Sequence, residues 1–84
     1  MSDFEEDLDP ATIGTFADLL LQGCTVDLTG YYGVTVPVNR LQMLVQAAVE
    51  GGGHLKISGS YIHARQLRDM GAIGGRHLTV VFDN

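Results

Sequence analysis

Apolar side chains recur at helical spacing in three segments of the chain, three or four residues apart. The apolar face of the first segment is formed by Ile13, Phe16, Ala17, Leu20 and Leu21. The second has Leu41, Leu44, Val45 and Ala48, widened by Met43 and Ala47, and the third has Ala64, Leu67 and Met70. The first helix is expected to start at Asp9-Pro10 and to end at Gly23. The second should start near Pro37 and end at Gly51 to Gly53. The third should start at Ser60 and be broken at Gly71 and at Gly74-Gly75.

Three short β-prone runs follow these helical segments. They are the alternation of Cys24, Val26 and Leu28, the run with Leu55 and Ile57, and the sequence HLTVVF at 77–82. The last run is apolar on both faces, which is typical of a strand in a parallel sheet covered by helices on both sides. The pattern therefore predicts a three-layered α/β fold in the order α-β-α-β-α-β, with three parallel strands and right-handed crossovers.

Three strands make a small sheet with two open edges, and an open edge can pair with another chain. Self-association or docking to a partner protein is therefore expected. The chain of 84 residues suits one domain, which we place at residues 9–84, after a flexible acidic tail at residues 1–8.

The net charge of −5 comes from the start of the chain, where five acidic residues lie within the first ten positions. Acidic and basic residues balance over the rest. The acidic segment is interpreted as a solvated end, with a docking arm for a basic partner as the alternative. Nucleic-acid binding is not expected, because the chain has no basic stripe and no cluster of aromatic and basic residues.

Membrane insertion and export are not expected either. No apolar run approaches the roughly 20 residues that span a bilayer, and the acidic start does not resemble a secretory signal. A single cysteine, Cys24, cannot form an internal disulfide, which favours a cytoplasmic location. In its apolar alternation, Cys24 is expected to be a buried structural residue.

No candidate catalytic, metal or cofactor site is evident, so we expect a non-enzymatic protein without cofactors. His54, His63 and His77 do not follow a zinc-binding spacing, and we expect His54 and His77 at one end of neighbouring strands. The three glycines at 51–53 follow a helix, whereas a phosphate-binding loop precedes one. An enzymatic role for Cys24 or a histidine would require a nucleophile, a base and an orienting group, and the sequence shows no such set.

The order and spacing of these pieces resemble a STAS domain, the fold of anti-sigma-factor antagonists and related bacterial regulators. The resembling segments are LDPATIGTFADLLLQGCTVDLTG (8–30), LVQAAVEGGGHLKISG (44–59) and RQLRDMGAIGGRHLTVVFD (65–83). The resemblance implies a protein-interaction or regulatory module. STAS domains usually begin with a β-hairpin, whereas here only a few acidic residues precede the first helix.

In phosphorylated STAS domains, a serine in the loop before the second helix accepts phosphate from a partner kinase. The matching position here is Val36 or Val38, and neither has a hydroxyl group. Thr35, the nearby hydroxyl, is interpreted as a loop or capping residue. Control by phosphorylation is therefore not expected.

The resemblance and the strand-to-helix position together place the partner-binding surface at residues 30–40. Its candidate residues are Tyr31, Tyr32, Val34, Thr35, Val36, Val38, Asn39 and Arg40. The tyrosines suit either an interface or packing beneath the loop. Arg65 and Arg68 are expected on a solvated helix face, with a carboxylate-binding patch as the alternative. The alternative function is a structural subunit of a homo-oligomer or of a larger assembly, for example a lipid-transport complex, that completes its sheet with a neighbour.

Overall fold

Helices and strands alternate through the residues that the computed structural model describes, which are 10–29, 36–59 and 62–82. The elements are α1 (Pro10–Leu21), β1 (Thr25–Asp27), α2 (Val38–Gly51), β2 (His54–Ser58), α3 (Ala64–Gly74), the 3-10 helix η1 (Gly75–His77) and β3 (Leu78–Val81). The strands form one sheet in the order β1-β2-β3, and both neighbouring pairs are parallel. This confirms the predicted α/β fold and the α-β-α-β-α-β order.

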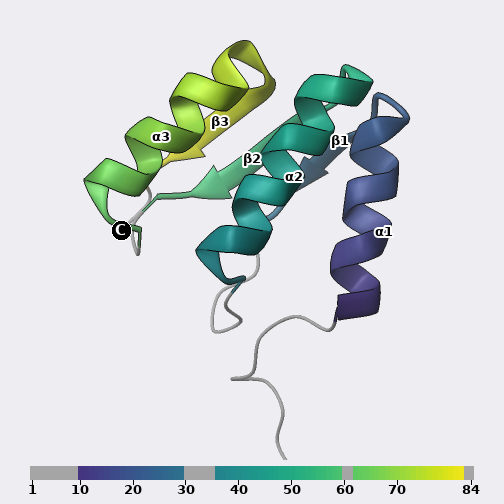
Figure 1. Cartoon of the computed structure of the whole chain (residues 1–84), viewed down its shortest axis with the longest axis horizontal. Helices are drawn as coiled ribbons and strands as arrows, with labels where there is room; N and C mark the ends of the chain where they lie inside the picture. The colour runs from purple at the N-terminus through teal and green to yellow at the C-terminus, as the bar shows by residue number, and fades with distance from the viewer. Residues whose placement is uncertain (1–9, 30–35, 60–61, 83–84) are drawn as a thin grey trace, which may run out of the picture.

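The helices all lie on the same face of the sheet (Figure 1), so the described residues form two layers and the prediction of three layers is wrong. The strand order follows the chain order, and successive crossovers of one hand place α2 and α3 on the same side. The opposite face of β1 and β2 carries Thr25, Asp27, His54, Lys56 and Ser58, which are polar. β3 is an edge strand and all four of its residues are half-buried.

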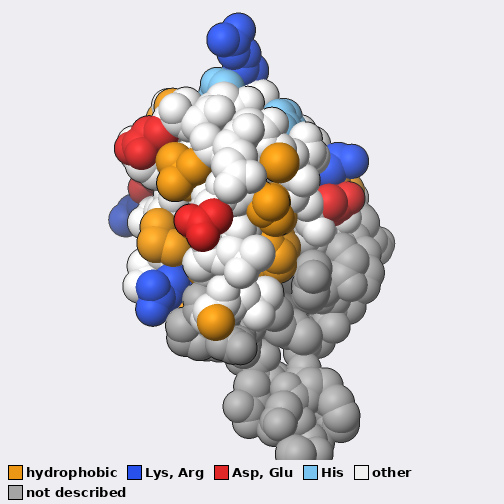
Figure 2. Space-filling view, turned by 90° about the vertical axis from the view of Figure 1, so that its right-hand side faces the viewer, with side chains coloured by type: hydrophobic (Ala, Val, Ile, Leu, Met, Phe, Trp, Pro, Cys, Tyr) orange, Lys and Arg blue, Asp and Glu red, His pale blue; other side chains and the backbone are white. Residues whose placement is uncertain are grey.

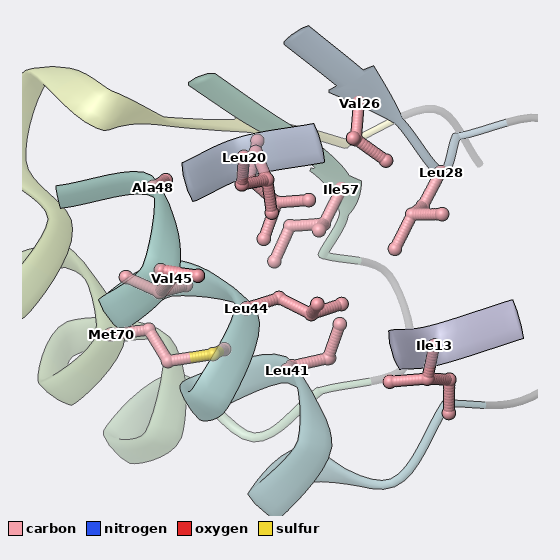
Figure 3. Packing of buried hydrophobic residues seen from close by; sticks show 12 residues of the cluster. Ile13, Leu20, Val26, Leu28, Leu41, Leu44, Val45, Ala48, Ile57 and Met70 are labelled. Atoms are coloured by element: carbon pink, nitrogen blue, oxygen red, sulfur yellow. The ribbon is translucent and has the colours of Figure 1, made fainter. Parts of the chain in front are cut away.

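The core lies between the sheet and the helices, and α2 occupies its centre (Figure 3). The largest fully buried side chains are Leu20, Leu44, Leu55, Ile57, Met70 and Val45. Three residues predicted to face inward do not do so: Leu21, Met43 and Ala64 are exposed. Each lies at the border of an apolar stripe, and a helix that packs on one side buries a stripe only about 100° wide.

Two glycines allow the ends of α1 and α2 to approach each other closely. A Cβ on Gly53 would lie 2.5 Å from the carbonyl oxygen of Leu20, and a Cβ on Gly51 would overlap the backbone of Leu21. Gly52 ends α2 with a positive φ of 77°. Helix termination therefore explains Gly52, whereas Gly51 and Gly53 are required for packing.

Two further predictions about local structure are wrong. Gly71 does not interrupt the third helix, which continues to Gly74 because one glycine costs only about 1 kcal/mol relative to alanine. Cys24 is exposed and precedes β1. It follows Gly23, which has a φ of 90°, and its backbone N–H donates to Leu19 at the end of α1, so Cys24 belongs to the turn.

Candidate functional site

The carboxyl ends of the three strands lie along one edge of the sheet, where the chain crosses into α2 and α3. In open α/β sheets this edge presents ligand and partner surfaces. Figure 1 shows α2 and α3 beginning on this side of the molecule. We call the described residues at this edge, 27–29, 36–40, 59, 62–65 and 82, the carboxyl-edge surface.

A short turn closes the end of β1. The backbone N–H of Thr29 donates to Asp27 Oδ1 at 2.9 Å, and the Thr29 hydroxyl donates to the same oxygen at 2.5 Å. These two bonds, the hydroxyl first, and the nearby Lys56 ammonium hold the pKa of Asp27 below its ordinary value of 3.8. Desolvation acts in the opposite direction and is outweighed. Asp27 is thus a carboxylate that helps to direct the chain out of the sheet.

Replacing Thr29 by valine is expected to raise the pKa of Asp27 towards its ordinary value, because the hydroxyl donor is lost. A carboxyl group whose pKa is lower in the folded state than in the unfolded state stabilises the fold at pH values above its unfolded pKa. This stabilisation is lost as the pH falls through the folded pKa. The variant should therefore lose less stability on acidification than the wild type. Carbon-detected NMR titration of the Asp27 carboxyl group measures the shift.

Thr15→Val is the matched control, because the Thr15 hydroxyl donates to the Ala11 carbonyl within α1. This control should leave the titration of Asp27 unchanged. An unchanged Asp27 pKa in Thr29→Val would show that the hydroxyl does not hold the carboxylate.

The first turn of α2 and the two residues before it contain half of the residues predicted to bind a partner. Pro37 is the N-cap residue and has no side-chain cap bond, while its carbonyl accepts the N–H groups of Arg40 and Leu41. Val36 packs partly against the core. Val38 is half-buried, whereas Asn39 and Arg40 are exposed. Asn39 and Arg40 are therefore the members of the described set that are most available to a partner.

The other half of the predicted set lies outside the described residues: Tyr31, Tyr32, Val34 and Thr35. Their part in partner binding therefore stays a prediction. The valine residues matched to the phosphorylation position, Val36 and Val38, are both partly covered, and Val36 anchors the chain to the core. Before α2, the apolar side chain of Val36 therefore helps to hold the start of the helix against the core.

The end of β3 and Ile62, which precedes α3, both contact Gly59. The Gly59 N–H donates to the Val81 carbonyl at 2.9 Å, and a Cβ on Gly59 would lie 2.9 Å from the ring of Phe82. Phe82 is 67% exposed, which is the largest value among the large hydrophobic residues in the described part of the chain. Ile62 is partly buried against the core, and His63 at the N-cap of α3 is exposed.

Phe82 was missed as a candidate by sequence reasoning, which treated it as the last residue of a covered strand. The sequence contains one signal that could have indicated this site, which is a glycine and an aromatic residue at the ends of two neighbouring strands. Gly59 ends β2, and an aromatic residue ending the neighbouring strand can lie over a position without a side chain. Only the register of β2 and β3 brings the two positions together.

Exposed cations are present at the starts of both helices. Arg40 lies in the first turn of α2 and Arg65 in the first turn of α3, and both are exposed. Neither first turn contains an acidic residue. Helix N-termini carry positive partial charge. The arginines and the helix N-termini therefore both contribute to a positive potential at this edge. The prediction that Arg65 and Arg68 lie on an exposed helix face is confirmed.

The histidines do not converge. His54 and His77 lie at the amino end of the sheet, as predicted: His54 Nε2 is 2.6 Å from Thr79 Oγ1, and His77 Nδ1 is 2.9 Å from the Gly53 carbonyl oxygen. His63 follows β2 at the carboxyl edge. Within residues 10–29, 36–59 and 62–82, no group of three or more histidine, cysteine, aspartate or glutamate side chains could hold a metal ion.

Comparison of the chain with protein-family models, with curated proteins and with solved structures gave no match. The structure itself shows a small α/β domain with three parallel strands. In the described part of the chain, no helix has the length and apolar character that crossing a bilayer requires.

Proposed function

We propose that the chain is a non-enzymatic protein-interaction module of the STAS type, which binds a protein partner through the carboxyl-edge surface. The observation that carries this proposal is the 67% exposure of Phe82 at the edge where α2 and α3 begin. Aromatic side chains, including phenylalanine, are enriched at protein interfaces relative to the rest of the surface.

Exposed cations at the carboxyl-edge surface support the choice of a protein surface with acidic groups as the partner. The exposed residues Arg40 and Arg65 lie in the first turns of α2 and α3. A central apolar contact with a polar, charged rim is the usual anatomy of a protein interface. The proposed binding does not depend on phosphorylation, because valine occupies the position matched to the phosphorylated serine of STAS regulators.

The test compares proteins that co-purify from native extract with the full chain and with the double variant Arg40→Glu, Phe82→Asp. Both side chains are exposed, so the variant should fold with a stability change within roughly 1 kcal/mol. The partner should be enriched by the wild type and lost, by about tenfold or more, with the variant, because the interface then lacks its apolar contact and has reversed charge. Quantitative mass spectrometry measures the ratio.

Met43→Asp is the matched control, because Met43 is also an exposed large hydrophobic residue but lies in the middle of α2. It should retain the partner at the wild-type level. Equal enrichment by the wild type and by a folded Arg40→Glu, Phe82→Asp variant would exclude the carboxyl-edge surface as the contact.

A further inference from the structure

The chain is built as an array of three helix–strand units, and the two ends of the array are complementary. Each helix packs beside the next, α1 against α2 and α2 against α3, and each strand pairs in parallel with the next. Among the residues that the structure describes, the array stops at β1 on one side and at β3 on the other. We define flank A as α1 with the outer edge of β1, and flank B as α3 with the outer edge of β3.

The outer edge of β3 is not protected against pairing. Natural edge strands carry charges, prolines or bulges that prevent pairing with another chain, whereas Leu78–Val81 has the sequence LTVV. Val81 directs its backbone towards β2, since its carbonyl accepts the Gly59 N–H. Polar backbone groups of successive residues in a parallel strand point to alternate sides. Val80 therefore directs its N–H and C=O outwards.

The outer edge of β1 matches this arrangement. The Cys24 carbonyl accepts the His54 N–H, and the Leu28 N–H donates to the Lys56 carbonyl, so Cys24, Val26 and Leu28 point towards β2. By alternation, Thr25 and Asp27 direct their backbone groups outwards. In a parallel pair, the N–H and C=O of one residue bond to the two residues on either side of its partner. The outward N–H and C=O of Val80 in one copy can therefore bond to Thr25 and Asp27 of the next copy, which places Val80 opposite Val26.

This register also keeps the helices of both copies on one face. Val26 is 6% exposed in the core beneath the helices, and Val80 packs against the same core. Paired residues in a parallel sheet share a face, so a Val80–Val26 pair between copies would place α1 of the second copy beside α3 of the first. The second copy then contributes α1 and β1 as a fourth helix–strand unit.

Charge is also complementary between the flanks. Residues 10–29 contain Asp18 and Asp27 and no lysine, arginine or histidine. Residues 62–82 contain Arg65, Arg68 and Arg76 against Asp69. Asp18, Arg65 and Arg68 are exposed. A contact between flank A and flank B therefore brings opposite charges together, whereas a contact between two like flanks brings like charges together.

Apolar surface is exposed on flank A beside the edge of β1. Leu19 is 36% exposed on α1, and Cys24 is exposed at the turn into the strand. Figure 2 looks onto this side of the molecule and shows hydrophobic side chains in a column down its centre, with charged side chains on either side. On flank B, Arg68 and Gly71 are exposed three residues apart on one face of α3.

We propose that the chain associates head to tail with further copies of itself, flank A of one copy on flank B of the next, through a parallel β3–β1 pair. Such a heterologous contact leaves one free flank at each end, so the assembly grows with concentration beyond a dimer. This inference is independent of the proposed partner at the carboxyl-edge surface.

Sedimentation velocity of the full chain over a series of concentrations tests the proposal. Leu19→Lys blocks flank A by placing a cation on α1 against the arginines of α3. The double variant Arg68→Glu, Gly71→Glu blocks flank B by placing two anions on α3 against Asp18 of α1. Each should weaken association by about tenfold or more. Met43→Lys, which alters neither flank, should assemble like the wild type. Circular dichroism confirms that each variant is folded.

Mixing the two blocked variants gives the decisive result. Each variant retains the flank that the other has lost, so the mixture should associate at concentrations at which each variant alone stays monomeric. A monomeric wild type at every concentration would overturn the proposal. So would a mixture that stays monomeric, a wild-type assembly that neither variant weakens, or an assembly that only one of them weakens, since that last result indicates a two-fold contact through one flank.

Discussion

Gly53→Ala is expected to destabilise the fold by about 3 kcal/mol, through the crowding of a well-packed site. The added Cβ would lie 2.5 Å from the Leu20 carbonyl oxygen and 2.7 Å from that of Cys24. Both are backbone atoms at the turn between α1 and β1, and the Cys24 carbonyl also accepts the His54 N–H. Relief of the clash would require α1 to move away from α2, which would open the core.

The expected loss is large for a domain of this size. A folded chain of 84 residues has a net stability of roughly 4–13 kcal/mol, and each kcal/mol changes the melting temperature by about 4–8 °C. Thermal and urea unfolding of Gly53→Ala should therefore show a melting temperature lower by more than about 10 °C. A change of less than about 0.5 kcal/mol would show that α1 and α2 are not in close contact at this point.

Two other glycines give matched controls, each with a different expected result. Gly52 has a φ of 77° and open space around its Cβ position, so Gly52→Ala should cost about 1 kcal/mol through backbone strain alone. Gly71 lies within α3 and also has open space. Gly71→Ala should stabilise the fold by up to about 1 kcal/mol, because alanine is the better helix former. The three variants separate steric, conformational and helix-propensity effects.

Leu44→Ala is expected to destabilise the fold by about 3 kcal/mol, because it leaves a cavity at the centre of the core. Leu44 is fully buried on α2, and α2 contacts α1, α3 and β2. The neighbouring structure can close such a cavity only in part, since these elements also hold one another in place. Urea unfolding should show a lower midpoint with an unchanged slope.

Met43→Ala is the control for Leu44→Ala, one residue away on the same helix. Met43 is 40% exposed, so its truncation should change stability by no more than about 0.5 kcal/mol. Equal losses for the two variants would mean that α2 does not bury its Leu44 face against the sheet.

The spacing of apolar residues along the chain was sufficient to predict the order of the elements and the faces of the helices. Leu20, Leu41, Leu44, Val45 and Ala48 are buried as predicted. These predictions succeed because helical and strand periodicities are local properties of the chain. The errors at Leu21, Met43 and Ala64 lie at the borders of the stripes, where burial depends on which neighbouring element covers that side of the helix.

The sequence indicated where the carboxyl-edge surface lies, but only part of its composition. The strand-to-helix corner before α2 follows from the fold class, and Asn39 and Arg40 are exposed there. Phe82 and Gly59 join this surface only through the register of β2 and β3. Residues 23 positions apart in the chain give no local signal that they meet, because their contact depends on the length and course of α3.

The sequence by itself determined that this chain forms three helix–strand units with a parallel sheet, since periodicity, caps and glycine breaks act over a few residues. Only the tertiary structure decided that all the helices lie on one face, that Cys24 is exposed, and that Gly51 and Gly53 form the contact between α1 and α2. It also decided which backbone groups of β1 and β3 face β2 and which face outwards at the edges of the sheet. These features depend on the relative placement of segments far apart in the chain, which the local pattern of residues does not contain.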